Sequence, residues 1–162
     1  MMTLDGSCRC GAVRFRVQSH APQPYQLCYC SICRKTAGGG GFAINLSAVA
    51  DTLEVEGRDA IGVYRAGIDR GGHCETSTGE RNFCTRCATA LWLYDPTWPE
   101  LIHPFASAID TDLAVPPTRT HLMLADKASW VVPAIAAGDL AFDEYPEQSI
   151  EDWHREKGLW LD

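Results

Sequence analysis

Residues 28–35 of the chain read C-Y-C-S-I-C-R-K, and two further cysteine groups lie on either side: C-R-C-G at residues 8–11 and C-T-R-C at residues 84–87. The three groups hold every cysteine except Cys74. Cysteines so close in the chain make poor disulfide partners but suitable metal ligands. The sequence therefore predicts a protein in which clustered thiolates on zinc, rather than disulfides, hold the fold together.

The spacing within each group suits zinc. The ion binds thiolate sulfur at about 2.3 Å in a tetrahedron, so neighbouring sulfurs lie roughly 3.8 Å apart. Residues i and i+2 of a strand face the same side, so a C-x-C pair can lean onto one ion, and Gly11 would permit the bend. C-x-x-C at Cys84 and Cys87 is the usual knuckle spacing. No single group fills four positions, so distant groups must combine or leave a site open.

Composition is that of an ordinary globular protein. The 162 residues are 46% hydrophobic, and we expect one domain over residues 1–162. The 14 basic and 21 acidic residues give a formal net charge of −7, which disfavours nucleic acid because binding it depends on Lys and Arg. Residues 1–7 lack a secretory-signal pattern, and no apolar run approaches a membrane span. We therefore expect a cytoplasmic protein with reduced thiols and no membrane partner.

Short alternating segments separated by Gly and Pro predict an all-β protein, either a barrel or a folded double sheet. Residues 12–17 (A-V-R-F-R-V) alternate most clearly. The other predicted strands are residues 41–46, 53–56, 61–65, 73–83, 90–94, 101–108 and 121–124. Two short helices are predicted, over residues 31–37 and, after Pro146, over residues 147–156.

The order of the three cysteine groups resembles that of a known family. G-x-C-x-C-G at residues 6–11, C-x-C-x-x-C-R-K at residues 28–35 and R-x-F-C-x-x-C at residues 81–87 are similar to the motifs of the glutathione-dependent formaldehyde-activating enzymes. That family also includes the centromere protein V domain. The motif-bearing core covers about residues 6–130, and residues 131–162 form a C-terminal extension. This chain has Tyr29 where the family usually has His and Ala88 where it usually has Gly.

The resemblance implies a tent of folded antiparallel β-sheets built around two zinc ions. It assigns Cys8, Cys10, Cys84 and Cys87 to a closed structural site, and Cys28, Cys30 and Cys33 to an open, catalytic site that loses its metal more readily. Spacing alone does not show this pairing of groups. It further implies a carbon–sulfur lyase with glutathione as co-substrate, that is, a small-molecule thiol and an aldehyde as partners.

The chemistry of an open three-thiolate site agrees with that activity. Three thiolates on Zn²⁺ leave a net charge of −1, so the ion should be poor at ionising water. It should still bind a substrate thiol as a fourth ligand and keep it deprotonated. A thiolate held in this way is ready to add to formaldehyde or a related small aldehyde. Thiol addition is therefore favoured over hydrolysis.

Several alternatives stay open at this stage. A further ligand could close the second site, and the candidates are His73, Cys74, His103 and His121. Cys84 and Cys87 could be a redox pair, and the whole protein could be a non-enzymatic zinc domain or act on another thiol or aldehyde. The basic residues beside the cysteines either meet the carboxylates of glutathione or form a solvated surface; they are Arg34, Lys35 and Arg86.

Overall fold

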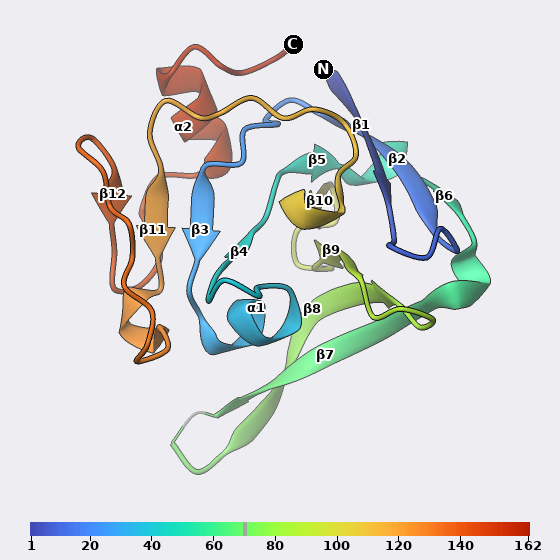
Figure 1. The fold of residues 1–162 in the computed structure, drawn as a ribbon, viewed down its shortest axis with the longest axis horizontal. Coiled ribbons are helices and arrows are strands. Elements are labelled where there is room, and N and C mark those ends of the chain that lie inside the picture. Colours follow the sequence, from blue (N-terminus) through green and yellow to red (C-terminus); the bar gives the residue numbers. More distant parts are fainter. Residues whose placement is uncertain (70) are drawn as a thin grey trace.

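Three sheets form the described part of the computed structural model, which comprises residues 1–69 and 71–162 (Figure 1). The first sheet has the order β1-β2-β6, with β1 (Met2–Ser7), β2 (Arg14–Ser19) and β6 (Glu54–Glu56). The second has the order β5-β10-β9-β8-β7, with β5 (Ala48–Val49), β10 (Leu101–Pro104), β9 (Ala90–Tyr94), β8 (Cys74–Cys84) and β7 (Ile61–Asp69). The third has the order β12-β11-β3-β4, with β12 (Leu140–Ala141), β11 (Thr120–Leu122), β3 (Gln26–Cys28) and β4 (Ala43–Ile44).

Helices are few and short, as predicted. The α-helices of the described residues are α1 (Ser31–Thr36) and α2 (Ile150–Glu156), with 3₁₀ turns η1 (Ala50–Thr52), η2 (Arg58–Ala60), η3 (Ala106–Ala108) and η4 (Leu124–Asp126). No helix in the described ranges has the length and apolar character needed to cross a bilayer. The all-β class predicted from the sequence is confirmed.

The main core lies between the first two sheets and follows from the alternation in β2. Phe15 and Val17 point inward and are buried, whereas Arg14 and Arg16 on the opposite face are exposed. The ring of Phe15 meets the ring of Trp92 edge-on, with centroids 5.2 Å apart. Burial of each such side chain stabilises the fold by about 1.5–3 kcal/mol. This packing holds β2 against β9, next to the end of β8.

The third sheet departs from the antiparallel expectation. β11 pairs in parallel with both β3 and β12, whereas β3 and β4 are antiparallel. β1, β3, β5 and β12 were not predicted. The last three have only two or three residues, too few to show a period of two. The parallel ladder matters for the site, since β3 ends at Cys28.

Three predicted elements need correction. The strand predicted over residues 41–46 is only β4, and the one over residues 101–108 ends at Pro104, after which the chain forms η3. The helix predicted over residues 147–156 begins at Ile150, because the Ser149 side chain caps it by accepting a hydrogen bond from the Asp152 N–H.

The helix α2 is attached to the third sheet through aromatic packing. Trp153 is buried and stacks on Tyr25, just before β3, with ring centroids 3.8 Å apart. The adjacent His154 ring is also buried; its Nδ1 donates to the Ile150 carbonyl at 2.7 Å, and its Nε2 accepts from the Gln23 N–H at 3.2 Å. The bond from Gln23 needs the neutral ring, because Nε2 can accept a hydrogen bond only when it carries no proton.

This geometry predicts acid destabilisation through His154. Burial lowers the pKa of His154 below its ordinary value. The unfolded chain therefore binds more protons than the folded one below about pH 6.5, and stability falls as the pH falls. Urea unfolding at pH 7.5 and pH 5.5 should show this loss, and His154→Gln should make it smaller. An equal loss in the variant and the parent would contradict this assignment.

Candidate metal centres

Four cysteines from the two ends of the motif region meet in one cluster. Cys8 follows β1, Cys84 ends β8, and Cys10 and Cys87 lie in the turns that follow. The sulfur of Cys10 lies 3.5 Å from that of Cys8 and 3.8 Å from that of Cys84. All four sulfurs lie within 4.8 Å of one another. The grouping expected from the resemblance is therefore present in the structure.

Two turns shape this four-cysteine cluster. Gly11 has a φ of +74° and its N–H donates to the Cys8 carbonyl at 3.0 Å, which is the bend expected after Cys10. Ala88 has a φ of +60° and its N–H donates to the Cys84 carbonyl at 2.8 Å. A left-handed residue is needed there, which explains why glycine suits the position better than alanine.

Thr89 joins the two turns to each other. Its hydroxyl oxygen accepts a hydrogen bond from the Arg9 N–H at 3.1 Å and lies 3.2 Å from the Cys87 sulfur. Hydrogen bonding to Thr89 lowers the pKa of Cys87 to about 5. One sulfur of the cluster is thus biased toward the thiolate that a metal requires.

A second cluster brings Cys28, Cys30 and Cys33 together. Cys28 ends β3, Cys30 precedes α1, and Cys33 lies in the first turn of that helix. The Cys30 sulfur caps α1 by accepting the Cys33 N–H at 3.3 Å. All three side chains are buried, and their sulfurs lie within 4.8 Å of one another. The end of β3 and the start of α1 thus place the three thiols next to one another.

The three buried thiols ionise unequally. Hydrogen bonds from the thiols of Cys28 and Cys33 lower the pKa of Cys30, and the same contact raises the pKa of Cys28. The pKa of Cys33 is raised: hydrogen bonding with Cys28 lowers it, but contact with Cys30 and burial raise it by more, while the charge of Arg81 opposes the rise. Only a cation among the sulfurs would allow all three to be thiolates at neutral pH.

Within residues 1–69 and 71–162, no fourth Cys, His or carboxylate joins the three-cysteine cluster. The Nδ1 of His103 bonds the Leu46 carbonyl at 3.0 Å, and that of His121 bonds the Tyr29 hydroxyl at 2.9 Å. His73 and Cys74 are exposed in the β7–β8 hairpin region. None of the four residues considered as a further ligand lies in the cluster.

Tyr29 stands between two of these cysteines and belongs to a buried polar chain. Its hydroxyl is hydrogen-bonded to His121 Nδ1 at 2.9 Å, and His121 Nε2 lies 3.4 Å from the Asp139 carboxylate. Asp139 also accepts the Arg119 and Ala136 N–H groups at 2.7 and 2.9 Å, and these hydrogen bonds lower its pKa. These hydrogen-bonded side chains come from three distant segments, so no local pattern in the sequence predicts that they meet.

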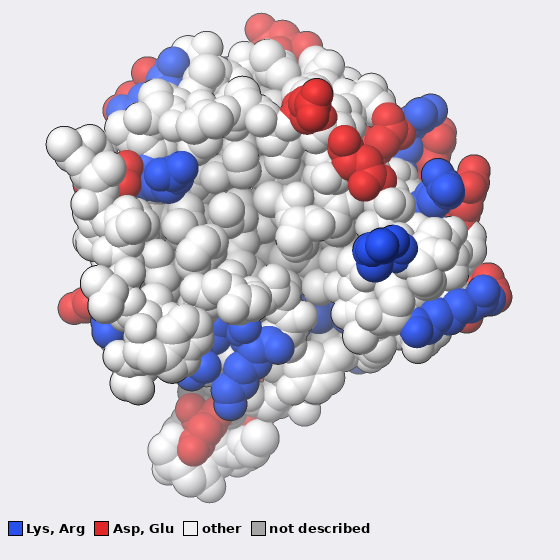
Figure 2. Space-filling view, in the orientation of Figure 1, with Lys and Arg blue, Asp and Glu red and all other residues white. Residues whose placement is uncertain are grey.

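Arginine side chains border the three-cysteine cluster. Arg34 lies in the last turn of α1 with its Nε buried and without a hydrogen-bond partner among the described residues. Arg86, by contrast, is exposed and paired with Asp59 at 3.4 Å. Figure 2 shows Lys and Arg side chains gathered between α1 and the β7–β8 hairpin, on a chain whose net charge is −7. The approach to this part of the molecule is basic.

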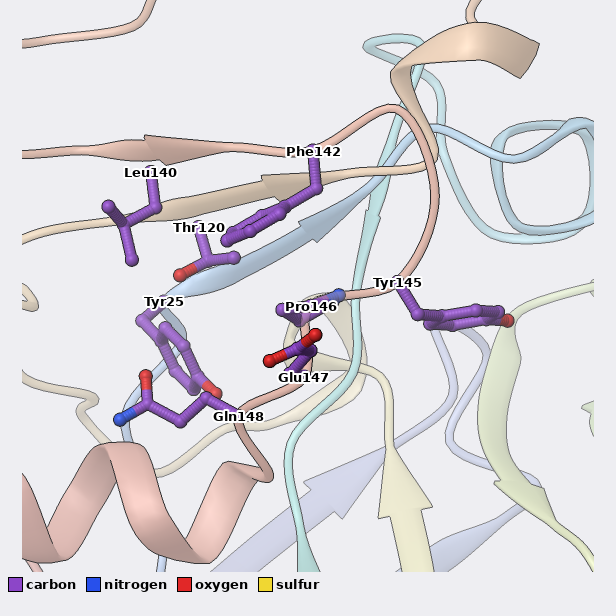
Figure 3. A pocket seen from close by; sticks show the side chains of 8 residues that line it. All are labelled: Tyr25, Thr120, Leu140, Phe142, Tyr145, Pro146, Glu147 and Gln148. Atoms are coloured by element: carbon purple, nitrogen blue, oxygen red, sulfur yellow. The ribbon is translucent and has the colours of Figure 1, made fainter.

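Two cavities differ in their relation to the cysteines. One of about 400 Å³ lies between the third sheet and the segment before α2 (Figure 3); it is lined by Tyr25, Thr120, Leu140, Phe142, Tyr145, Pro146, Glu147 and Gln148. Tyr145 turns away from the other seven side chains (Figure 3). None of the residues that line this cavity is a cysteine.

The other cavity has a volume of about 280 Å³ and shares two lining residues with the hydrophobic cluster that contains Cys28, Cys30 and Cys33. Its lining residues are Thr36, Tyr64, Arg81, Asn82, Phe83, Ala88, Ala90 and Phe105. Ala90 and Phe105 pack in the same hydrophobic cluster as the three cysteines. We call this space the β8 cavity.

Both clusters have the donor chemistry of zinc sites. Sulfurs 3.5 and 3.8 Å apart are too distant for disulfide bonds, and all eight cysteines are free. The separations match the roughly 3.8 Å expected between thiolates on one tetrahedral zinc. Cys8, Cys10, Cys84 and Cys87 could fill four positions, whereas Cys28, Cys30 and Cys33 could fill three.

The fold and the two clusters define a mainly β protein organised around one group of four cysteines and one group of three. The family model described as glutathione-dependent formaldehyde-activating enzyme matches residues 3–125. The chain belongs to this family.

Two similar proteins illustrate the relationship. A protein of Halomonas elongata named "Putative glutathione-dependent formaldehyde-activating enzyme" is 60% identical over 158 residues, which cover 98% of each chain. A Rhodobacter sphaeroides protein of known crystal structure is 22% identical and has a TM-score of 0.52, covering 87% of this chain and 99% of its own. The second likeness concerns the fold alone.

Proposed function

We propose that this protein is a zinc-dependent enzyme that catalyses the reversible addition of glutathione to formaldehyde, a carbon–sulfur lyase activity. The observation that carries the proposal is the three-cysteine cluster, to which no described residue adds a fourth donor. Family membership and the name of the Halomonas elongata relative support glutathione and formaldehyde as the substrates. We also propose that residues 1–162 act as one cytoplasmic domain.

The two clusters have separate roles in this proposal. Cys8, Cys10, Cys84 and Cys87 hold a structural zinc that joins the end of β1 to the end of β8. Cys28, Cys30 and Cys33 hold the second zinc, which, when bound, supplies a position where an incoming thiol is kept deprotonated.

The reaction needs a thiolate, an aldehyde and a proton. The glutathione sulfur forms a bond to the formaldehyde carbon, the C=O π pair moves to oxygen, and that oxygen takes up the proton released by the thiol. The reverse reaction returns both substrates. Phe105, Ala90 and Leu122 surround the cysteines with apolar surface and limit the access of water. The basic surface near α1 attracts an anionic substrate such as glutathione (Figure 2).

Exchange spectroscopy tests the activity. Glutathione and ¹³C-formaldehyde form the adduct slowly enough for two-dimensional NMR to measure both directions, and zinc-loaded protein should raise both rate constants. Cys33→Ala should return them to the rates in buffer. Cys74→Ala serves as the control, since Cys74 is exposed and outside both clusters, and it should remain fully active.

The same experiment separates the competing functions. If the parent protein leaves the exchange rates unchanged with glutathione, the proposed activity is wrong. Acceleration with another thiol or aldehyde alone would then assign the site to that substrate. No acceleration with any pair would leave a structural zinc domain as the remaining interpretation.

A further inference from the structure

Arg81 is a buried arginine, and two of its three guanidinium nitrogens have no hydrogen-bond partner among the described residues. It lies in β8 between the partner residues Tyr64 on β7 and Leu93 on β9, and only 9% of its surface is exposed. Its Nε and Nη1 atoms are buried and have no hydrogen-bond partner in the described parts of the chain. A buried guanidinium left unpaired is costly, so a partner that binds from outside would stabilise it.

The surrounding carboxylates do not supply that partner. Burial raises the pKa of Asp95, but the hydrogen bonds from Thr97 and Thr78 lower it by more, and the nearby charge of Arg81 adds a smaller lowering. Those hydrogen bonds have lengths of 2.8–3.0 Å and occupy both carboxylate oxygens. Two other strand arginines pair directly with carboxylates, Arg16 with Asp5 at 2.8 Å and Arg65 with Glu80. Arg81 differs from them in being both buried and unpaired.

Arg81 lines the β8 cavity, which shares its walls with the three-cysteine cluster. Apart from Arg81, the lining is mostly apolar or aromatic, including Phe83, Ala90 and Phe105. A molecule in this cavity would thus meet one cation at the side of a largely apolar space, next to Ala90 and Phe105, which also pack in the cluster of the three cysteines. This is a suitable arrangement for an acidic molecule with a thiol at its other end.

We propose that Arg81 binds a carboxylate of the thiol co-substrate in the β8 cavity and thereby makes the enzyme selective for acidic thiols. The guanidinium is always protonated and offers a planar set of donors that match a carboxylate. Anchoring the carboxylate directs the sulfur toward Cys28, Cys30 and Cys33, so Arg81 is a specificity-determining residue. This inference rests on the proposed function for the identity of the thiol.

The experiment compares glutathione with its dimethyl ester, in which both carboxylates are blocked but the thiol is kept. Calorimetric titration of zinc-loaded parent protein should show glutathione binding about 10–100-fold more tightly than the ester, the factor typical of hydrogen bonds to a charged group. In Arg81→Gln the affinity for glutathione should fall by the same factor, while the affinity for the ester stays unchanged. Arg81→Lys should lose less than Arg81→Gln.

A second arginine near the cysteines provides a matched control for Arg81→Gln. Arg86→Gln removes an exposed arginine already paired with Asp59 and should leave both affinities unchanged. The comparison of glutathione and ester in the parent needs no variant, so it holds even if Arg81→Gln misfolds. The role of Arg81 would be overturned if the parent bound glutathione and the ester with equal affinity, or if it did not bind glutathione at all. It would also be overturned if Arg81→Gln weakened the binding of both ligands equally. Failure of formaldehyde exchange with selective glutathione binding intact would instead contradict only the proposed function.

Discussion

Replacing Cys84 with alanine is expected to unfold the protein. Cys84 is fully buried, and its sulfur joins the end of β8 to the loop that carries Cys10, 74 residues earlier in the chain. A structural zinc contributes about 10–16 kcal/mol of apparent folding free energy in small zinc domains. Since whole domains are stable by only about 5–15 kcal/mol, loss of this ion should abolish the native state at 25 °C.

Circular dichroism and tryptophan fluorescence check this result. Cys84→Ala should lose the native β signal and the fluorescence of the buried Trp92, whereas Cys74→Ala should match the parent. A strong chelator should unfold the parent in the same way. A folded Cys84→Ala protein with an unchanged thermal midpoint would show that the four-cysteine cluster does not hold the fold together.

Replacing Cys33 with alanine is expected to abolish activity and leave the fold intact. Cys33 lies in a six-residue helix, and the other two ligands of its cluster are close in sequence. A zinc held by these three cysteines would therefore tie together only a short segment, and its loss would remove little folding energy beyond about 1 kcal/mol for the small cavity left behind. Two ligands are too few to retain the metal.

Zinc analysis and unfolding experiments measure both parts of this prediction. The parent should contain two zinc ions per chain and Cys33→Ala one, with formaldehyde exchange reduced to the rate in buffer. The unfolding midpoint should change little. If Cys33→Ala unfolds as Cys84→Ala does, the three-cysteine cluster is structural, and the contrast between the two sites is wrong.

The cysteine groups could be predicted from the sequence, but not the strand arrangement that brings separate groups together. C-x-C and C-x-x-C spacings depend on local geometry, so Cys8 with Cys10 and Cys84 with Cys87 could be predicted as local pairs. The joining of these pairs depends on how β1 and β8 meet across the core, which no local pattern encodes. Only the resemblance to the family supplied that grouping. The parallel pairing of β3 with β11, which positions Cys28 at the end of β3, is equally non-local.

Arg81 shows why side-chain environments were harder to predict than strands. An arginine inside a strand normally indicates a solvated face, and residues 73–83 were correctly predicted as β structure. Arg81 lines the β8 cavity together with Phe105 and with Thr36 at the end of α1, both distant in sequence. The buried hydrogen bond between Tyr29 and His121 has the same origin, because the two residues are 92 positions apart. In both cases tertiary packing decides the environment.

Cobalt substitution tests directly whether the three-cysteine site accepts a thiol. Loaded with two Co²⁺ ions, the protein should show thiolate-to-cobalt charge-transfer absorption from seven cysteines. One equivalent of glutathione should increase that absorption by one further thiolate, and Cys33→Ala, with only the four-cysteine site filled, should not respond. An unchanged spectrum of the parent at saturating glutathione would contradict the account, because it would mean that no position is open to an incoming sulfur.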